Sequence, residues 1–317
     1  MKKTAKDAIS QLFKDKDLNL HFGDSEVFTY SRIPFGIPSL DKLTNGGIPK
    51  KKLTLIYGPT NVGKSYLASQ VIANVQNSGG KAAWIDTELS WDAEWFFKCG
   101  VDVPETIVAQ PNNAEQAFDT VRKLMQAGVD VIVLDSIAGL VPETVAEEEF
   151  SYNPMAWQAR FVNSSLPKLL PNLQYGSAFI AINQVRASMG PTALDNMPGG
   201  LAQTFFAHFL LQVRRSGWID EGEGKNKEKV GFNMEVRLRK TKVGGENWKS
   251  VTVPFRVEGG IDIVESYIRE AIERKIIIQT GAWYNYKDDK VMGLNGVKQL
   301  FLENDELFNS LKNELTT

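Results

Sequence analysis

Gly58-Pro59-Thr60-Asn61-Val62-Gly63-Lys64-Ser65 matches the pattern G-x-x-x-x-G-K-S. An apolar, β-branched run at 53–57 precedes this motif, and a helical pattern at 66–76 follows it. A phosphate-binding loop requires this order of strand, loop and helix, because glycines let several N–H groups face one anion and the helix N-terminus adds positive charge. Lys64 is expected to reach the β- and γ-phosphates, and the Ser65 hydroxyl to bind Mg²⁺. The predicted nucleotide-binding residues of this stretch are Gly58, Pro59, Thr60, Asn61, Val62, Gly63, Lys64, Ser65 and Tyr66.

Composition bounds what the rest of the chain can be. Its 317 residues are 43% hydrophobic and 23% charged, which suits one large α/β core with a smaller appended piece. No apolar run approaches the length of a membrane span, which is about 18 residues. The basic N-terminus lacks the apolar stretch of a signal peptide. Cys99 is the single cysteine, so it excludes an internal disulfide, and we expect it to be buried. With a net charge of −2, a polyanion must be bound by a local patch.

Acidic residues lie at or just after the ends of two predicted buried strands, at 81–86 and 129–136. Ligands of α/β sheets bind at the carboxyl ends of the strands. Glu88 could hold a water in line with a γ-phosphate, although a glutamate stabilised by a helix dipole is the alternative. Asp135 matches the second acid of a phosphate-loop enzyme, which holds Mg²⁺.

Two stretches beside this predicted site carry further candidates. Residues 91–99 form a helical aromatic cluster, which is either core or supplies one ring to stack on a nucleotide base. A buried strand at 177–184 ends in the amides Asn183 and Gln184, and a Gly-, Pro- and Met-rich segment follows at 185–200. Long segments of this kind in compact domains are often functional.

The remaining pattern predicts the outer parts of the fold. We expect an amphipathic helix over 1–20, packed on its own domain or on a neighbouring subunit, and a helix over 156–173 bent or broken at Pro167. Strands are expected at 209–214, 233–239 and 248–255, and the second ends in Lys240 and Lys242, which are either solvated or reach an anion on a neighbour. A boundary near 259–260 precedes a helix at 263–274, an aromatic hairpin at 281–287 and a last helix at 305–315. The predicted division is an N-terminal arm at 1–34, a core at 35–260 and a small C-terminal domain at 261–317.

In combination these motifs make the chain resemble the RecA recombinases, especially phage-encoded members, from about Phe35 to the C-terminus. The resemblance is carried by the phosphate loop together with 85–88, 131–136, 182–186, 240–242 and 281–284. It implies an α/β fold, a RecA-like P-loop NTPase core whose mostly parallel sheet is flanked by helices. It also implies an ATP- and Mg²⁺-dependent ATPase that forms filaments on single-stranded DNA and exchanges strands with a homologous duplex. The resemblance further implies a cytoplasmic location without a membrane partner. Single-strand-binding or loader proteins would be accessory partners.

The resemblance also implies a role for individual residues. Glu88 would activate the attacking water, and Asp135 would hold Mg²⁺ through water. Gln184 would sense the γ-phosphate and pass its state to the following loop. Trp95 would stack on adenine with Asp92 near the base. Lys240 and Lys242 would reach the ATP of the next subunit, where other NTPases use an arginine finger.

Two loops match the DNA-binding loops of the family, the first at about 147–160 and the second at 185–200. Met155 and Met189 would wedge between base triplets, at an unstacking cost repaid by new contacts. Arg160 and Arg186 would contact phosphates, and the backbone of Gly199 and Gly200 would offer N–H groups. The chain departs from the family pattern in a slightly shorter second loop with Ser188 at a basic position, in the acidic residues 147–149, and in lacking an acidic tail after Thr317. Weaker restraint on duplex binding is expected from the last difference.

Two other classes of protein share part of this pattern. One is a RecA-fold ATPase of another kind, such as a hexameric helicase or a clock-type or repair-accessory ATPase, against which the two loops and the Lys240–Lys242 pair argue. The other is a non-enzymatic relative that binds nucleotide only for assembly, against which Lys64, Glu88 and Asp135 argue. ATPase assays and electron microscopy with single-stranded DNA separate the three.

Overall fold

The computed structural model describes residues 9–10, 12–13, 15, 18, 20–143, 154–185, 197–221 and 227–316. The chain divides into two units, Met1–Ser31 and Arg32–Thr317. In the first unit, η2 (Glu26–Phe28) is a 3-10 turn capped by the Ser25 hydroxyl, and Phe13 stacks on Phe22 with ring centroids 4.5 Å apart. Most of the helix predicted over 1–20 falls outside the described residues.

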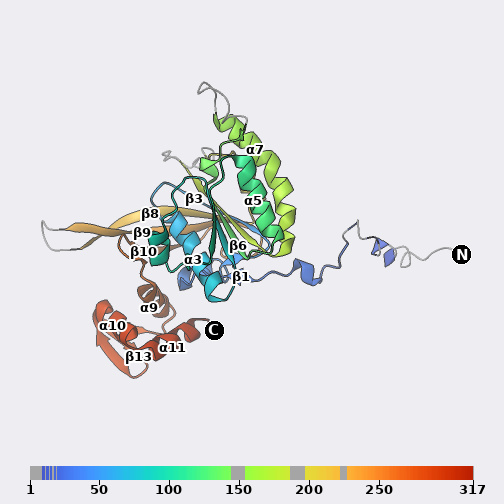
Figure 1. Cartoon of the computed structure of the whole chain (residues 1–317). Coiled ribbons are helices and arrows are strands. Elements are labelled where there is room, and N and C mark those ends of the chain that lie inside the picture. The colour runs from blue at the N-terminus through green and yellow to red at the C-terminus, as the bar shows by residue number, and fades with distance from the viewer. Residues whose placement is uncertain are drawn as a thin grey trace. The chain divides into compact units, whose positions relative to one another are not determined.

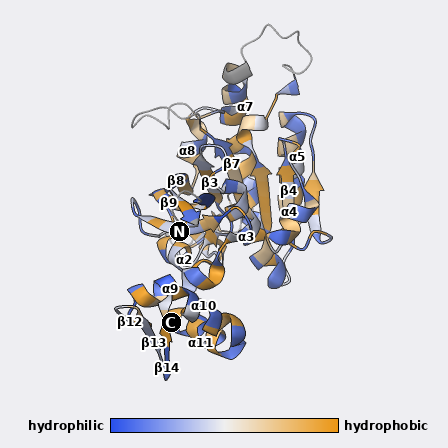
Figure 2. Cartoon of the chain, turned by 90° about the vertical axis from the view of Figure 1, so that its left-hand side faces the viewer, coloured by the Kyte–Doolittle hydropathy of each residue, from blue (hydrophilic) through white to orange (hydrophobic). Residues whose placement is uncertain are grey.

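A nine-stranded sheet forms the centre of the second unit, in the order β11-β10-β9-β8-β3-β7-β6-β4-β5. The six strands from β8 to β5 are parallel, as predicted for a phosphate-loop fold. Most of these strands are hydrophobic along their whole length, because helices cover both faces of the parallel half (Figure 2). Their bounds are β3 (Leu53–Gly58), β4 (Ala82–Asp86), β5 (Thr106–Ala109), β6 (Val131–Asp135), β7 (Ala178–Gln184) and β8 (Phe209–Glu221).

Helices pack on the two faces of this sheet in separate hydrophobic clusters (Figure 1). One face is covered by α2 (Pro38–Leu43), α3 (Lys64–Asn77) and α4 (Ala93–Lys98), and the other by α5 (Ala114–Gln126) and α7 (Pro154–Leu169). Cys99 is buried in the first cluster, as predicted. Short connections complete the core, namely β1 (Arg32–Ile33), β2 (Ile48–Pro49), η3 (Ile137–Gly139), η4 (Leu170–Tyr175) and α8 (Ala202–Phe206).

Three antiparallel strands extend the sheet past β8, namely β9 (Glu228–Thr241), β10 (Ser250–Arg256) and β11 (Gly260–Ile261). β8 and β9 run well beyond the stretches predicted at 209–214 and 233–239. Their outer residues pair with each other in a two-stranded ribbon (Figure 1). Backbone hydrogen bonds between β8 and β9 keep these largely polar residues in strands, although their side chains are little buried. A hydrophobic pattern alone does not predict such an extension.

Residues 263–316 form a small α/β segment with its own core around Ile268, Phe301 and Leu311. It contains α9 (Ile263–Glu273), β12 (Ile278–Thr280), β13 (Trp283–Tyr286), β14 (Asp289–Met292), α10 (Gly293–Glu303) and α11 (Asp305–Thr316). The aromatic stretch predicted as a hairpin is instead one central strand, β13, which pairs with β12 on one side and β14 on the other. Both tight turns lie outside the aromatic residues.

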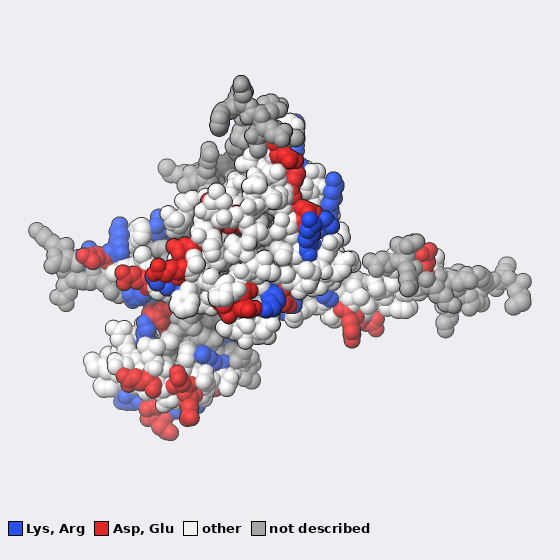
Figure 3. Space-filling view, in the orientation of Figure 1, with Lys and Arg blue, Asp and Glu red and all other residues white. Residues whose placement is uncertain are grey.

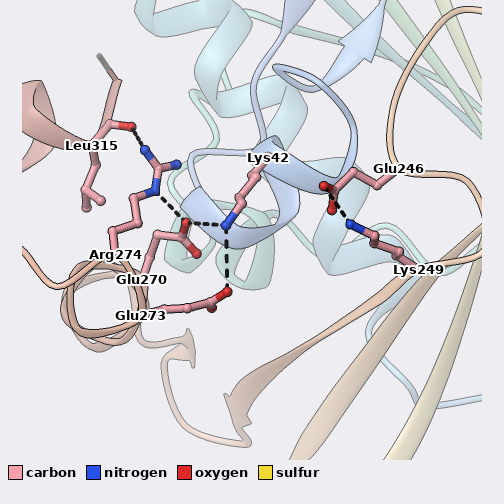
Figure 4. A network of polar contacts seen from close by, with 7 residues as sticks. All are labelled: Lys42, Glu246, Lys249, Glu270, Glu273, Arg274 and Leu315. Atoms are coloured by element: carbon pink, nitrogen blue, oxygen red, sulfur yellow. Dashed lines mark hydrogen bonds and ion pairs between the residues drawn. The ribbon is translucent and has the colours of Figure 1, made fainter.

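A network of charges joins this segment to helix α2 (Figure 4). Lys42 of α2 lies 3.3 Å from the buried carboxylate of Glu270 and 3.7 Å from Glu273, both on α9. Arg274 donates to the same Glu270 oxygen at 2.8 Å and to the Leu315 carbonyl at 2.9 Å. The buried carboxylate is therefore shared by two cations, one from each side of the predicted boundary near 260. That boundary itself stays a prediction.

Two further differences concern helices. Pro167 lies inside α7, which continues to Leu169 before it tightens into η4, so the proline does not break the helix. No element was assigned at 101–126, where the structure has β5 and the amphipathic helix α5, which Asn113 caps by accepting from the Gln116 N–H at 2.8 Å.

Candidate functional site

The phosphate-loop motif adopts the predicted turn between β3 and α3, and its two glycines are each required by a neighbour. A Cβ on Gly58 would lie 2.0 Å from the Val213 carbonyl oxygen of β8. Gly63 has a φ of +90°, and a Cβ there would lie 2.2 Å from Cε of Met234. A side chain at position 58 would therefore push the β8 backbone away from the loop, whereas one at position 63 would displace the end of the Met234 side chain and be strained at this positive φ.

Lys64, Ser65 and Asp135, three of the predicted site residues, lie close together at this loop. The Lys64 side chain is 7% exposed, and its Nζ donates to the Pro59 carbonyl at 2.5 Å. Burial lowers the pKa of Lys64, while Asp135 and Glu88 act in the opposite direction. The lysine therefore closes the loop with a hydrogen bond that an anion in the loop can replace.

Ser65 Oγ donates to Asp135 Oδ2 at 2.6 Å, which brings together the two predicted magnesium ligands. Burial, together with the nearby Glu88 and Asp86 carboxylates, raises the pKa of Asp135 to about 6, against the lowering effects of the Ser65 hydrogen bond and of Lys64. A cation there would relieve this repulsion. Among the described residues, no group of three or more His, Cys, Asp or Glu could hold a metal ion. Mg²⁺ needs only one or two protein oxygens when phosphates and water complete its shell, so the pair fits it.

Glu88 lies at the carboxyl end of the sheet beside this pair. Its Oε1 accepts hydrogen bonds from Ser136 Oγ and, at 2.6 Å, from Gln184 Nε2. These residues follow or end β4, β6 and β7, which are adjacent strands. The structure thus brings together the predicted water-activating carboxylate and the predicted sensor amide.

Sequence reasoning missed the side chains that shape the Glu88 turn. Asp86 is fully buried, and its carboxylate accepts from the Glu88 N–H at 3.2 Å and the Trp91 N–H at 2.9 Å. Gln110 also donates to it at 3.0 Å, and these bonds hold the Asp86 pKa below its usual value despite burial. The run Ile85-Asp86-Thr87-Glu88 indicates an acidic turn after β4. It does not show that Asp86 binds the backbone of the turn while Glu88 lies at the site.

The predicted base-binding residues lie at the start of α4. Asp92 caps this helix by accepting from the N–H groups of Glu94 and Trp95 at 2.9 and 3.2 Å. Trp95 is 37% exposed and packs edge-on against Phe96, whereas Trp91 and Phe96 stack within the core. Trp95 is thus partly exposed at the start of α4, while Phe97, at 72% exposed, is the most exposed ring of the cluster.

Tyr66 directs its side chain away from the loop. Its hydroxyl accepts from the Ile261 N–H at 3.0 Å, burial raises its pKa to about 12, and its ring packs edge-on against Phe255. A Cβ on Gly260 would lie 2.2 Å from this ring. Only the Tyr66 backbone N–H, in the first turn of α3 where such groups lack helical partners, is in place to contact an anion.

Lys240 and Lys242 lie together at the end of β9, but they contact helix α8 of their own chain. Lys240 Nζ donates to the carbonyls of Thr204 and Phe205 at 2.5 and 3.0 Å, and Lys242 Nζ donates to Phe205 at 2.9 Å. Cations at the last carbonyls of a helix are favourable. Burial and the neighbouring Lys242 lower the pKa of Lys240.

The described parts of the two predicted DNA loops flank one groove. This groove of about 360 Å³ lies between α7 and the start of α8 and is lined by Arg160, Gly199, Gly200 and Phe205 among others. Arg160 lies over the Trp157 ring at 5.5 Å, and Gly199 and Gly200 have φ values of +78° and +73°. Arg186, Met189 and the side chain of Met155 lie outside the described residues.

Two buried amides anchor the end of the second loop. Asn183 Nδ2 donates to the Pro198 carbonyl and to Gln203 Oε1, both at 2.8 Å. Gln203 Nε2 donates to the carbonyls of Pro198 and Gly200 at 2.6 and 2.8 Å. The loop end is therefore tied to the tip of β7 directly beside Gln184. Asn183 ends a predicted strand, but no sequence signal distinguished Gln203.

On the face drawn in Figure 3, charge does not by itself single out a nucleic-acid site. Figure 3 shows acidic and basic side chains interspersed on one side of the molecule, without a continuous patch of one sign among the described residues. In the described part of the chain, none of the helices combines the length and apolarity needed to span a membrane.

A parallel sheet with a phosphate loop, a Ser–Asp pair and a glutamate at its carboxyl edge defines an α/β ATPase of the P-loop class. A family model described as the RecA N-terminal domain matches residues 3–262. Protein RecA of Acinetobacter baumannii is 32% identical over 97% of this chain and 89% of its own length, and the chromosomal Protein RecA of Lactococcus lactis is 32% identical over 99% and 83%. The chain belongs to the RecA family. It is accordingly a DNA-dependent ATPase that acts in homologous recombination and repair through strand exchange, and the family as a whole uses ATP with Mg²⁺ and forms filaments on DNA.

Proposed function

We propose that this chain binds MgATP at the phosphate loop and hydrolyses it with Glu88 as the residue that holds the attacking water. The observation that carries the proposal is the meeting of Ser65 with Asp135 and of Glu88 with Gln184 at one edge of the sheet. The first pair supplies hard oxygen ligands, and the second places a carboxylate beside an amide able to register a γ-phosphate.

Each residue has a distinct task in this proposal. Lys64 exchanges its bond to Pro59 for the phosphates, and the loop N–H groups hold their charge. Mg²⁺, when bound, offsets phosphate charge and favours the ionised form of Asp135. Asp92 and Trp95 bind the adenine end, with Trp95 stacking on the ring.

The active site is completed by a second subunit in this proposal. Lys240 and Lys242 leave the carbonyls of α8 and contact the triphosphate held by the neighbouring chain. Their positive charge then stabilises the charge that develops on the transferred phosphoryl group. ATP hydrolysis therefore depends on head-to-tail assembly.

Single-stranded DNA is the assembly template that we infer. Arg160 and Arg186 bind phosphates, Gly199 and Gly200 offer backbone N–H groups, and Met155 and Met189 wedge between bases. The groove between α7 and α8 supports this, because it joins described parts of both loops beside the lysines of β9. Duplex DNA is the second substrate.

DNA-stimulated turnover measured together with filament imaging tests the proposal. We expect turnover to rise on adding single-stranded DNA and negative-stain images with a slowly hydrolysed ATP analogue to show helical filaments. Lys64→Ala should lower turnover by about 100-fold or more, because it removes the phosphate cation. Lys98→Ala is the matched control, since Lys98 is exposed and pairs with the exposed Glu94. Closed rings, or turnover unaffected by DNA, would contradict the proposal.

A further inference from the structure

Two donors bind the same oxygen of Glu88. Ser136 Oγ and Gln184 Nε2 both donate to Oε1. Within the described part of the chain, no hydrogen bond or ion pair reaches Oε2, and Glu88 is an exposed residue. One oxygen of the carboxylate is therefore held while the other remains available, which is the arrangement that a carboxylate needs in order to orient a water.

The two donors differ in how firmly the fold holds them. Ser136 is fully buried at the tip of β6, and its backbone is bound twice to one side chain. Thr87 Oγ1 accepts from the Ser136 N–H at 2.8 Å and donates to the Ser136 carbonyl at 2.7 Å. In return, the Thr87 N–H donates to the Asp135 carbonyl at 2.9 Å. The segments that carry Ser136 and Glu88 are thus joined by these hydrogen bonds directly beside the Ser136–Glu88 side-chain bond.

Gln184 lies in a different setting. It is half-buried and ends β7, at the entrance to the second predicted DNA loop. If Gln184 turns toward a γ-phosphate, as the proposed function requires, its donor leaves Glu88. A single hydrogen bond to Oε1 then remains, and it is the one from Ser136.

We infer that Ser136 is a positioning residue for hydrolysis, which keeps the Glu88 carboxylate oriented while Gln184 changes partner. The inference rests on the proposed role of Glu88. Ser136 does not touch the reacting atoms in this account. Its hydroxyl acts through Glu88, and Thr87 keeps that hydroxyl in place.

The test compares Ser136→Ala with a matched serine variant. Ser177→Ala also removes a fully buried hydroxyl, one that donates to the Val129 carbonyl at 2.5 Å near the opposite end of β7. We expect Ser136→Ala to lower kcat of the full-length protein with single-stranded DNA by about 10- to 100-fold, because misplaced catalytic groups cost rates of that order. KM for ATP should stay within about twofold. Ser177→Ala should leave kcat nearly unchanged.

A double-variant cycle separates positioning from a structural role. In a Glu88→Gln background, adding Ser136→Ala should lower the residual turnover by no more than about twofold, because the group that Ser136 orients has already been removed. Ser136→Thr, which keeps a hydroxyl, should restore part of the lost kcat. The inference about Ser136 would be overturned if Ser136→Ala kept the wild-type kcat, or if Ser136→Ala lowered kcat by the same factor in the Glu88→Gln background as in the wild type. Either result would leave the proposed function standing. Absence of turnover in the wild-type protein would overturn the proposed function, and this inference with it.

Discussion

At the scale of single residues, burial shifts the pKa of several groups, among them His208 near the proposed lysine pair. Burial lowers the pKa of His208 to about 4, and the charges of Lys52, Lys242 and Lys240 act in the same direction. The His208 Nδ1 accepts from the Leu53 N–H at 3.3 Å, a bond that needs the neutral ring. Asp135 shows the opposite case, a carboxyl whose pKa burial raises to about 6.

These shifts predict how stability depends on pH. Between about pH 6.5 and 4 the unfolded chain binds a proton at His208 that the folded chain does not, so this group favours unfolding as pH falls. Two buried carboxyls have the opposite effect on stability. Burial raises the pKa of Asp135 to about 6 and that of Asp41 to about 7, so the folded chain keeps protons that the unfolded chain releases, and both groups favour folding as pH falls. We therefore predict how the difference in stability between the wild type and a His208→Gln variant changes with pH. The urea midpoint of the wild type should fall relative to His208→Gln below pH 6.5, and a pH-independent difference between the two proteins would contradict this.

At the scale of elements, the phosphate loop is shaped by the strands on either side of it. Gly58 ends β3 in extended backbone and directly faces the Val213 carbonyl of β8. Gly63 begins the turn into α3 against Met234 of β9. The glycines of the motif therefore serve the packing of β8 and β9 beside the loop as well as the loop's own turn.

Gly58→Ala should consequently destabilise the core. A Cβ 2.0 Å from a carbonyl oxygen forces β3 and β8 apart, and overpacking of this kind costs about 1–3 kcal/mol or more. Gly217→Ala, on the facing strand β8, is the control, since the nearest atom to its Cβ is Asn233 Nδ2 at 3.7 Å. Urea unfolding monitored by tryptophan fluorescence measures both variants. Equal unfolding midpoints in the two would show that β8 moves aside at little cost.

At the scale of the whole molecule, the proposed active site is divided between two chains. The phosphate loop and Glu88 come from one chain, and Lys240 and Lys242 come from the next. A head-to-tail contact of this kind is heterologous and grows into a helix when it does not close. The lysine pair and Lys64 can then be supplied by different polypeptides.

Mixing two inactive variants tests this division. Lys64→Ala and the double variant Lys240→Ala/Lys242→Ala should each lose DNA-stimulated turnover. An equimolar mixture should recover about a quarter of wild-type turnover, since random head-to-tail order makes that share of the contacts complete. A mixture of Lys64→Ala with Glu88→Gln is the control and should recover none, because both defects lie in the same half-site. Equal recovery in the two mixtures would contradict a shared site.

The sequence alone was sufficient for the class of fold and for the residues of the phosphate loop. Lys64, Ser65 and Asp135 lie in a local motif and at a strand end, and chain direction alone brings such ends to one edge of a parallel sheet. The strand-end pattern also raised Glu88, Gln184 and the lysine pair as candidates, and the family resemblance added a role for each. The structure places Glu88 and Gln184 in contact.

Tertiary structure decided the parts that depend on contacts between distant segments. The bonds of Ser136 and Thr87 to the Glu88 turn, and of Asn183 and Gln203 to the second loop, join residues far apart in the chain. Tyr66 lies in the predicted loop region, but the backbone of β11 captures its hydroxyl. Hydrophobic pattern and motif spacing record which residues are buried and which turn sharply. They do not record which polar atom of one strand end will face which atom of the next, because packing sets that partner only once the sheet has formed.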